Sequence, residues 1–84
     1  MKKYYKADLG GAQRSIVADT STGRITLFYI HKNLHIVNEG IYSTEIKPGE
    51  TRSDFEIRLE IYNECTLSDI QPNLLLIKNH INSL

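Results

Sequence analysis

Two histidines, His31 and His35, are spaced like the zinc-binding pair of a helix. Zinc proteases carry a glutamate directly after the first histidine as their general base, whereas this chain has Lys32 there. The surrounding β-branched and aromatic residues favour a strand, and a two-residue turn at 32–33 then directs the two imidazoles to opposite faces of a sheet. We therefore expect no metal site. A helix over 25–38 is the alternative that would restore the pair.

The single cysteine, Cys65, follows Glu64 directly. Neighbouring carboxylates disfavour a thiolate, so we expect Cys65 to be a half-buried structural residue and not a nucleophile. One cysteine also excludes an internal disulfide framework and a thiolate zinc site. The segment from Gly10 to Arg14 lacks the Gly-Lys-Ser/Thr of a phosphate-binding loop, so we expect a turn there and no bound cofactor.

Glu56 and Glu60 are the carboxylate pair best placed by spacing for acid–base catalysis. On a strand they would lie about 13 Å apart, farther than the catalytic carboxylates of glycosidases. Arg58 lies between them and favours a solvated series of alternating charges. We therefore expect no catalytic residues in this chain. The surface expected to contact a protein partner consists of Glu56, Arg58, Glu60 and Glu64.

Charge is balanced over the whole chain and uneven along it. Ten Lys and Arg residues match ten Asp and Glu residues, and the net charge of zero argues against a general affinity for nucleic acid. Basic residues nevertheless dominate 1–38 and acidic residues dominate 39–69. Nucleic-acid binding by the basic half, with tyrosines that stack on bases, is therefore our alternative hypothesis. Its residues are Lys2, Lys3, Lys6, Arg14, Arg24, Tyr4 and Tyr5.

Closely spaced turn signals predict a series of β-hairpins. Gly23 suits the left-handed position of a three-residue loop over 21–23. The segment 24–31 is dense in β-branched and aromatic residues and predicts a central strand. The strands that we expect span 4–9, 14–20, 24–31, 34–38 and 41–46.

The segment 53–65 has two interpretations. Phe55, Ile57, Leu59 and Ile61 alternate with polar residues, which is typical of a half-buried strand. Against this, Ser53-Asp-Phe-Glu is a capping-box pattern, and residues 55, 59 and 62 share one face of a helix. We favour the strand, because a helix would leave Ile57 in solvent.

A C-terminal helix is indicated by Pro72, which suits the first helical position. Leu74, Ile77, Ile81 and Leu84 follow it with helical spacing and form an apolar stripe. A helix this short is marginal in isolation, so we expect it to dock on the apolar face of the sheet. Removing the chain from residue 72 onward should then unfold the domain.

These patterns predict one α+β domain over residues 1–84, a small antiparallel β-meander of about four to six strands with a C-terminal helix packed on one face. We expect no membrane segment, because no apolar run approaches the ~20 residues that a spanning helix needs. The start of the chain lacks the apolar region of a signal peptide, so we expect a cytoplasmic location. We expect a small non-catalytic protein–protein interaction module, such as an inhibitor, an antitoxin-like or an accessory regulatory protein. Open sheet edges also favour a homodimer.

Overall fold

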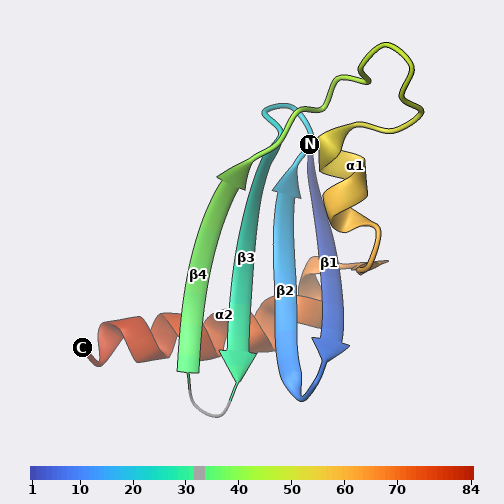
Figure 1. The fold of residues 1–84 in the computed structure, drawn as a ribbon. Helices are drawn as coiled ribbons and strands as arrows, with labels where there is room; N and C mark the ends of the chain where they lie inside the picture. The colour runs from blue at the N-terminus through green and yellow to red at the C-terminus, as the bar shows by residue number, and fades with distance from the viewer. Residues whose placement is uncertain (32–33) are drawn as a thin grey trace.

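The computed structural model of the protein describes residues 1–31 and 34–84. Four strands follow one another as an antiparallel meander, and a short fifth strand returns to the free side of the first (Figure 1). The strand order is β4-β3-β2-β1-β5. The strands are β1 (Lys2–Leu9), β2 (Ala12–Asp19), β3 (Arg24–His31), β4 (Leu34–Ile41) and β5 (Asn63–Cys65). The expected antiparallel sheet is therefore confirmed, whereas the expected turn at 32–33 lies outside the described residues.

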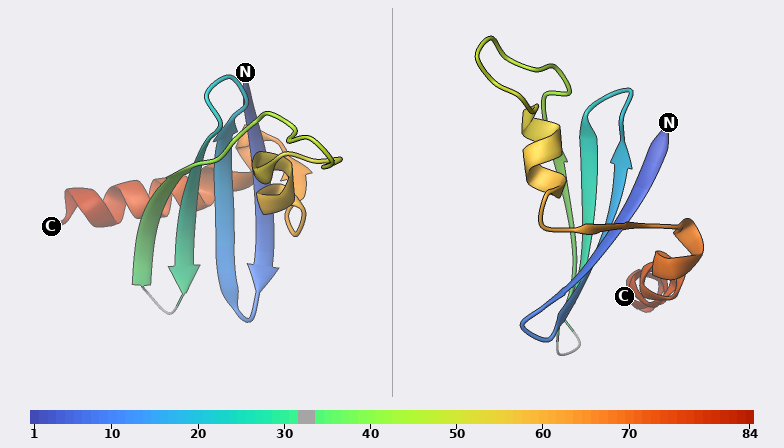
Figure 2. Two further views of the ribbon diagram at one scale, coloured as in Figure 1. Left: turned by 45° about the horizontal axis from the view of Figure 1, so that its top comes forward. Right: turned by 90° about the vertical axis from the view of Figure 1, so that its right-hand side faces the viewer.

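Two helices lie on opposite faces of this sheet, as Figure 2 shows in its right-hand view. Helix α1 (Asp54–Leu59) packs on one face, and α2 (Leu67–Asn82) packs on the other. Side chains alternate between the two faces along each strand. Ile16 therefore faces α1, while its neighbour Ser15 faces α2 and is fully buried. The expected C-terminal helix is confirmed, whereas cover on the second face of the sheet was not predicted.

Helix α1 takes the place of most of the strand that we favoured over the 53–65 segment, so that expectation was wrong there, whereas the last three residues of the segment do form a strand, β5. As a helix, the segment directs Phe55, Leu59 and the following Tyr62 together into the sheet, where all three are buried. Ser53 caps the helix, since its hydroxyl accepts a hydrogen bond of 3.2 Å from the Glu56 backbone N–H. The cost is two exposed isoleucines, Ile57 at 46% and Ile61 at 61%. Burial on the sheet stabilises the helical arrangement by roughly 1.5–3 kcal/mol for each side chain of the size of Phe or Leu.

The strand expected over 41–46 is also wrong beyond its first residue. Ile41 pairs with Arg24, the first residue of β3, so a longer β4 would have no neighbour to pair with. The chain instead crosses to α1, and the Tyr42 N–H donates a hydrogen bond of 2.8 Å to the Gly23 carbonyl. Gly23 has φ +72°, as expected for the hairpin loop, and a Cβ at this position would collide with the Tyr42 carbonyl oxygen.

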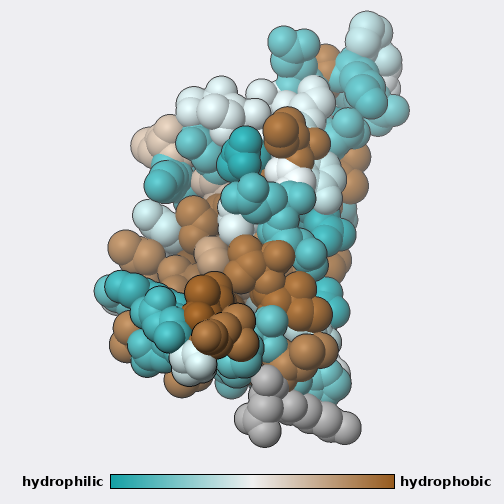
Figure 3. Space-filling view, turned by 90° about the vertical axis from the view of Figure 1, so that its left-hand side faces the viewer, coloured by the Kyte–Doolittle hydropathy of each residue, from teal (hydrophilic) through white to brown (hydrophobic). Residues whose placement is uncertain are grey.

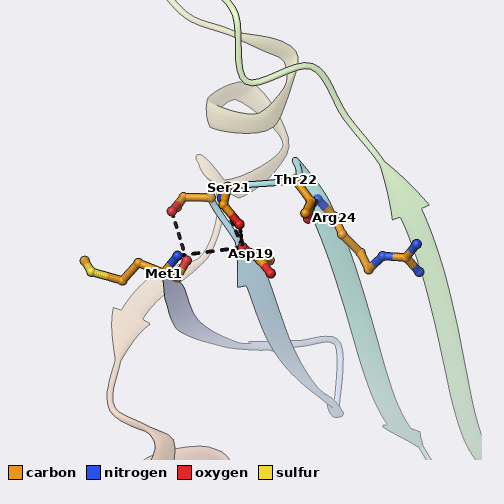
Figure 4. A network of polar contacts seen from close by, with 6 residues as sticks. Met1, Asp19, Ser21, Thr22 and Arg24 are labelled. Atoms are coloured by element: carbon orange, nitrogen blue, oxygen red, sulfur yellow. Dashed lines mark hydrogen bonds and ion pairs between the residues drawn. The ribbon is translucent and has the colours of Figure 1, made fainter.

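Asp19 joins the β2–β3 turn to the start of the chain (Figure 4). Its carboxylate accepts hydrogen bonds from the Ser21 hydroxyl at 2.6 Å and the Ser21 N–H at 3.0 Å. The Met1 ammonium lies 3.8 Å from the same carboxylate. These hydrogen bonds from Ser21 are the main reason that the pKa of Asp19 lies below its usual value. The Met1 carbonyl also accepts hydrogen bonds from Thr20, so the N-terminus is tied to the sheet.

Helix α2 begins at Leu67, five residues before the start that we expected from Pro72. The Asp69 carboxylate accepts hydrogen bonds of 2.9 Å from both the backbone N–H and the hydroxyl of Thr66. Pro72 therefore lies inside the helix, so its expected position was wrong. The Thr66-Leu-Ser-Asp69 pattern was the missed signal, because a hydroxyl residue followed three positions later by an acid is typical of a helix start.

Candidate functional site

The four residues expected to contact a protein partner do not form one series. Glu56 and Glu60 lie on one side of α1 and line a shallow hollow beside Tyr5. Arg58 points to another side of the helix, where it borders β3 and β4. Glu60 is paired with Arg52 at 2.9 Å. The expected surface of alternating charges required a strand over these residues. Because they form a helix, that surface does not exist in the structure.

Glu64 lies apart from α1, on β5, directly opposite Tyr5 of β1. The pKa of Tyr5 is raised, first because the phenol is partly buried and then because the Glu64 carboxylate is nearby. Three of the predicted acids thus border Tyr5, and Lys3 lines the same hollow as Glu56 and Glu60. The arrangement is an acidic surface that Arg52 and Lys3 partly neutralise.

The residues of the nucleic-acid alternative are divided between the two faces of the sheet. Lys3, Tyr5 and Arg14 occupy positions on the α1 face. The remaining residues alternate to the α2 face, namely Lys2, Tyr4, Lys6 and Arg24. Arg24 is also paired with Glu39 across the β3–β4 ladder at 3.0 Å. Lys6 and Arg14 border one hollow together with Asp8 and Asp69, so the set as a whole does not form one basic surface.

A cluster on the α1 face combines Arg14 with two residues that the sequence did not single out together. The Arg14 guanidinium lies over the Tyr29 ring, 5.2 Å from its centroid, as a cation–π contact. The Tyr29 hydroxyl and His31 Nδ1 are 3.3 Å apart. The pairing register of β2 with β3 could have predicted this cluster. Arg14 and Tyr29 are partners in that register, and strand alternation places His31 on the same face as Tyr29. The cluster suits recognition of a carboxylate or an aromatic group, because none of its three side chains is a carboxylate that would compete for the Arg14 guanidinium.

The two histidines at metal-binding spacing face opposite sides of the sheet, as the strand interpretation predicted. His31 lies with Tyr29, whereas His35 stacks on His80 of α2, with the ring centroids 4.5 Å apart. Among the described residues, no three His, Cys, Asp or Glu side chains are grouped to hold a metal ion. The His35–His80 pair therefore serves here as a contact between the sheet and α2.

Cys65 ends β5 and is half-buried. Burial raises the pKa of its thiol above the usual value, and the Asp69 carboxylate adds to this rise. The thiol is thus held in its neutral form, which is the less nucleophilic one.

An apolar hollow lies where α2 passes the free edge of β4. We call it the edge groove, an apolar hollow of about 310 Å³ between the sheet and the helix. Its lining residues are Phe28, Val37, Leu74, Ile77, Lys78, Ile81 and Asn82. Figure 3 views this side of the molecule, and hydrophobic side chains gather over its middle and lower parts. Exposed apolar area that is gathered in this way is typical of a contact surface.

The sequence predicted half of this groove. Leu74 and Ile77 of the predicted stripe do pack against the sheet, with Ile77 buried. Ile81 and Leu84 were expected to pack there too, but both are exposed, because α2 has by then passed the edge of the sheet (Figure 1). The buried position that the stripe missed is Ile70, one turn before its first member.

Comparisons with family models, curated proteins and solved structures found no match to this chain. Within the described residues, no helix combines the length and the apolar character needed to cross a membrane.

Proposed function

We propose that this protein is a non-catalytic protein-interaction module and that it binds its partner through the β4 edge and the edge groove. The observation that carries the proposal is the coincidence of a free strand edge with an apolar groove beside it. A free edge offers backbone hydrogen bonds to an added strand, and an adjacent pocket accepts the side chains of that strand. An inhibitor or accessory regulatory protein in the cytoplasm would act by such a contact.

The chemistry of the remaining clusters agrees with a binding role. The thiol of Cys65 is held neutral, and His35 and His80 are stacked on each other. Nucleic-acid binding has less support, because its expected residues lie on both faces of the sheet and Arg24 is already paired with Glu39. A salt-dependent affinity needs several cations on one surface.

Affinity capture from the native host tests the proposal with two matched variants. Val37→Lys places a charge in the edge groove, whereas Ile61→Lys makes a comparable change at an exposed position after α1. We expect proteins that are recovered with the wild type and Ile61→Lys to be lost with Val37→Lys. Recovery that Val37→Lys leaves unchanged, or that Ile61→Lys alone abolishes, would contradict the proposed surface.

A further inference from the structure

The two edges of the sheet are protected very differently. β4 has eight residues and, among the described residues, pairs only with β3. Its sequence, Leu-His-Ile-Val-Asn-Glu-Gly-Ile, contains no lysine, arginine or proline. Its one acidic side chain, Glu39, is neutralised by Arg24. Soluble proteins usually blunt an exposed edge with charge, proline or short length, and β4 uses none of these devices.

The opposite edge has the expected protection. β5 is only three residues long, and it covers β1 from Tyr4 to Lys6. Lysines occupy β1 at positions 2, 3 and 6, and Glu64 lies in the middle of β5. A strand that approached this side would meet charges and an interrupted edge. The contrast indicates that β4 is the edge kept open for pairing.

Helix α2 adds a second contact beside that edge. It crosses the strands and continues past β4, so that its C-terminal part has no sheet beneath it (Figure 1). It contacts β4 toward the Leu34 end, where His80 stacks on His35 and Ile81 lines the groove with Val37. The other end of β4 is left open, and Ile41 there is 74% exposed.

We infer that the partner bound at this surface is a second copy of the chain, paired β4 to β4 in an antiparallel manner about a two-fold axis perpendicular to the sheet. This inference rests on the proposed function and names the occupant of the same surface. Antiparallel pairing brings the Leu34 end of one β4 to the Ile41 end of the other. The projecting end of each α2 then covers the part of the partner's β4 that the partner's own helix leaves open.

The surface is therefore complementary to itself, as a two-fold interface requires. An eight-residue strand is about 27 Å long and can supply a continuous ladder between the copies. Two projecting helix ends add the apolar area, and an interface of this kind needs about 1,200–2,000 Å² in total. The net charge of zero means that overall repulsion does not oppose the association of two copies.

Sedimentation of the purified full-length protein tests the inference over about a hundredfold range of concentration. We expect the wild type and Ile61→Lys to reach twice the mass of one chain. Val37→Lys should weaken association by at least about a hundredfold, since two added cations would be buried near Lys78 without a carboxylate partner. Circular dichroism melts establish that both variants are folded.

Hydrogen exchange of the wild type provides a measurement that needs no variant. Amides of β4 should become better protected as the concentration rises, while the amides of β5 should not change. A wild type that stays monomeric throughout the range would overturn the inference, as would a dimer that Val37→Lys leaves intact or that protects β5 in place of β4. A monomeric wild type whose capture of host proteins is still lost with Val37→Lys would refute self-association and leave the proposed function standing.

Discussion

Replacing Ile70 with alanine should reveal how strongly α2 is held on the sheet. Because α2 forms one wall of the edge groove, the variant also tests how firmly that wall is held. Ile70 is 0% exposed and lies in the second turn of α2, on the face that packs against the strands. Removing a buried isoleucine side chain leaves a cavity and costs about 2–5 kcal/mol. The whole stability of a chain of this length is about 4–13 kcal/mol, so the variant should lose a large part of it.

Thermal unfolding followed by circular dichroism measures the loss. A cost of about 3 kcal/mol lowers the Tm by about 12–24 °C in a domain of this size. Leu75→Ala is the matched control on the same helix, because Leu75 is largely exposed and its truncation should change stability by less than about 0.5 kcal/mol. Equal Tm shifts for the two variants would refute the reasoning, since they would mean that α2 packs through a different face.

Four further predictions follow from the same contacts. Ser53→Ala should lower the free energy of unfolding by about 1 kcal/mol in urea, because it removes the cap of α1, and Ser53→Asp should restore part of it. Asp69→Asn should destabilise the protein at neutral pH. Since hydrogen bonds from Thr66 lower the folded-state pKa of Asp69, the stability difference between wild type and variant should disappear as the pH falls below 3.8 in urea titrations. Cys65 should react with iodoacetamide more slowly than free cysteine at neutral pH, and its rate should still be rising with pH at pH 9.0, because its pKa is raised; equal rates would contradict the burial that we describe. Deleting the chain from Pro72 onward should abolish the cooperative melt, since Ile77 and Leu74 leave with it.

The basic half of the chain offers one negative expectation. Gel-shift titrations with oligonucleotides should give no salt-dependent complex, because Lys3 and Lys6 take positions on opposite faces and Arg24 is already paired with Glu39. A complex whose affinity falls steeply with salt would revive the nucleic-acid alternative.

Interactions between near neighbours in the chain determine much of this fold. The β-branched and aromatic run over 24–31 defined an interior strand, and the need of Gly23 for a positive φ defined the hairpin that precedes it. The opposite orientations of His31 and His35 follow from strand alternation once His31 is paired with Leu34 across the hairpin. In each case the deciding interaction lies between near neighbours in the chain, so sequence patterns report it.

Only the tertiary structure decided between helix and strand for Phe55 to Tyr62. Both periods fit the local pattern, and burial against Ile16 and Ile25 selected the helix. The candidate site depended on tertiary structure in the same way. The sequence supplied the apolar stripe of α2, but where the stripe leaves the sheet depends on how far α2 extends across β4. The spacing of residues shows which side chains share a face of a helix. It does not show where the surface opposite that face ends. For this reason Ile81 was predicted to be buried, but it lies exposed at the edge of the sheet.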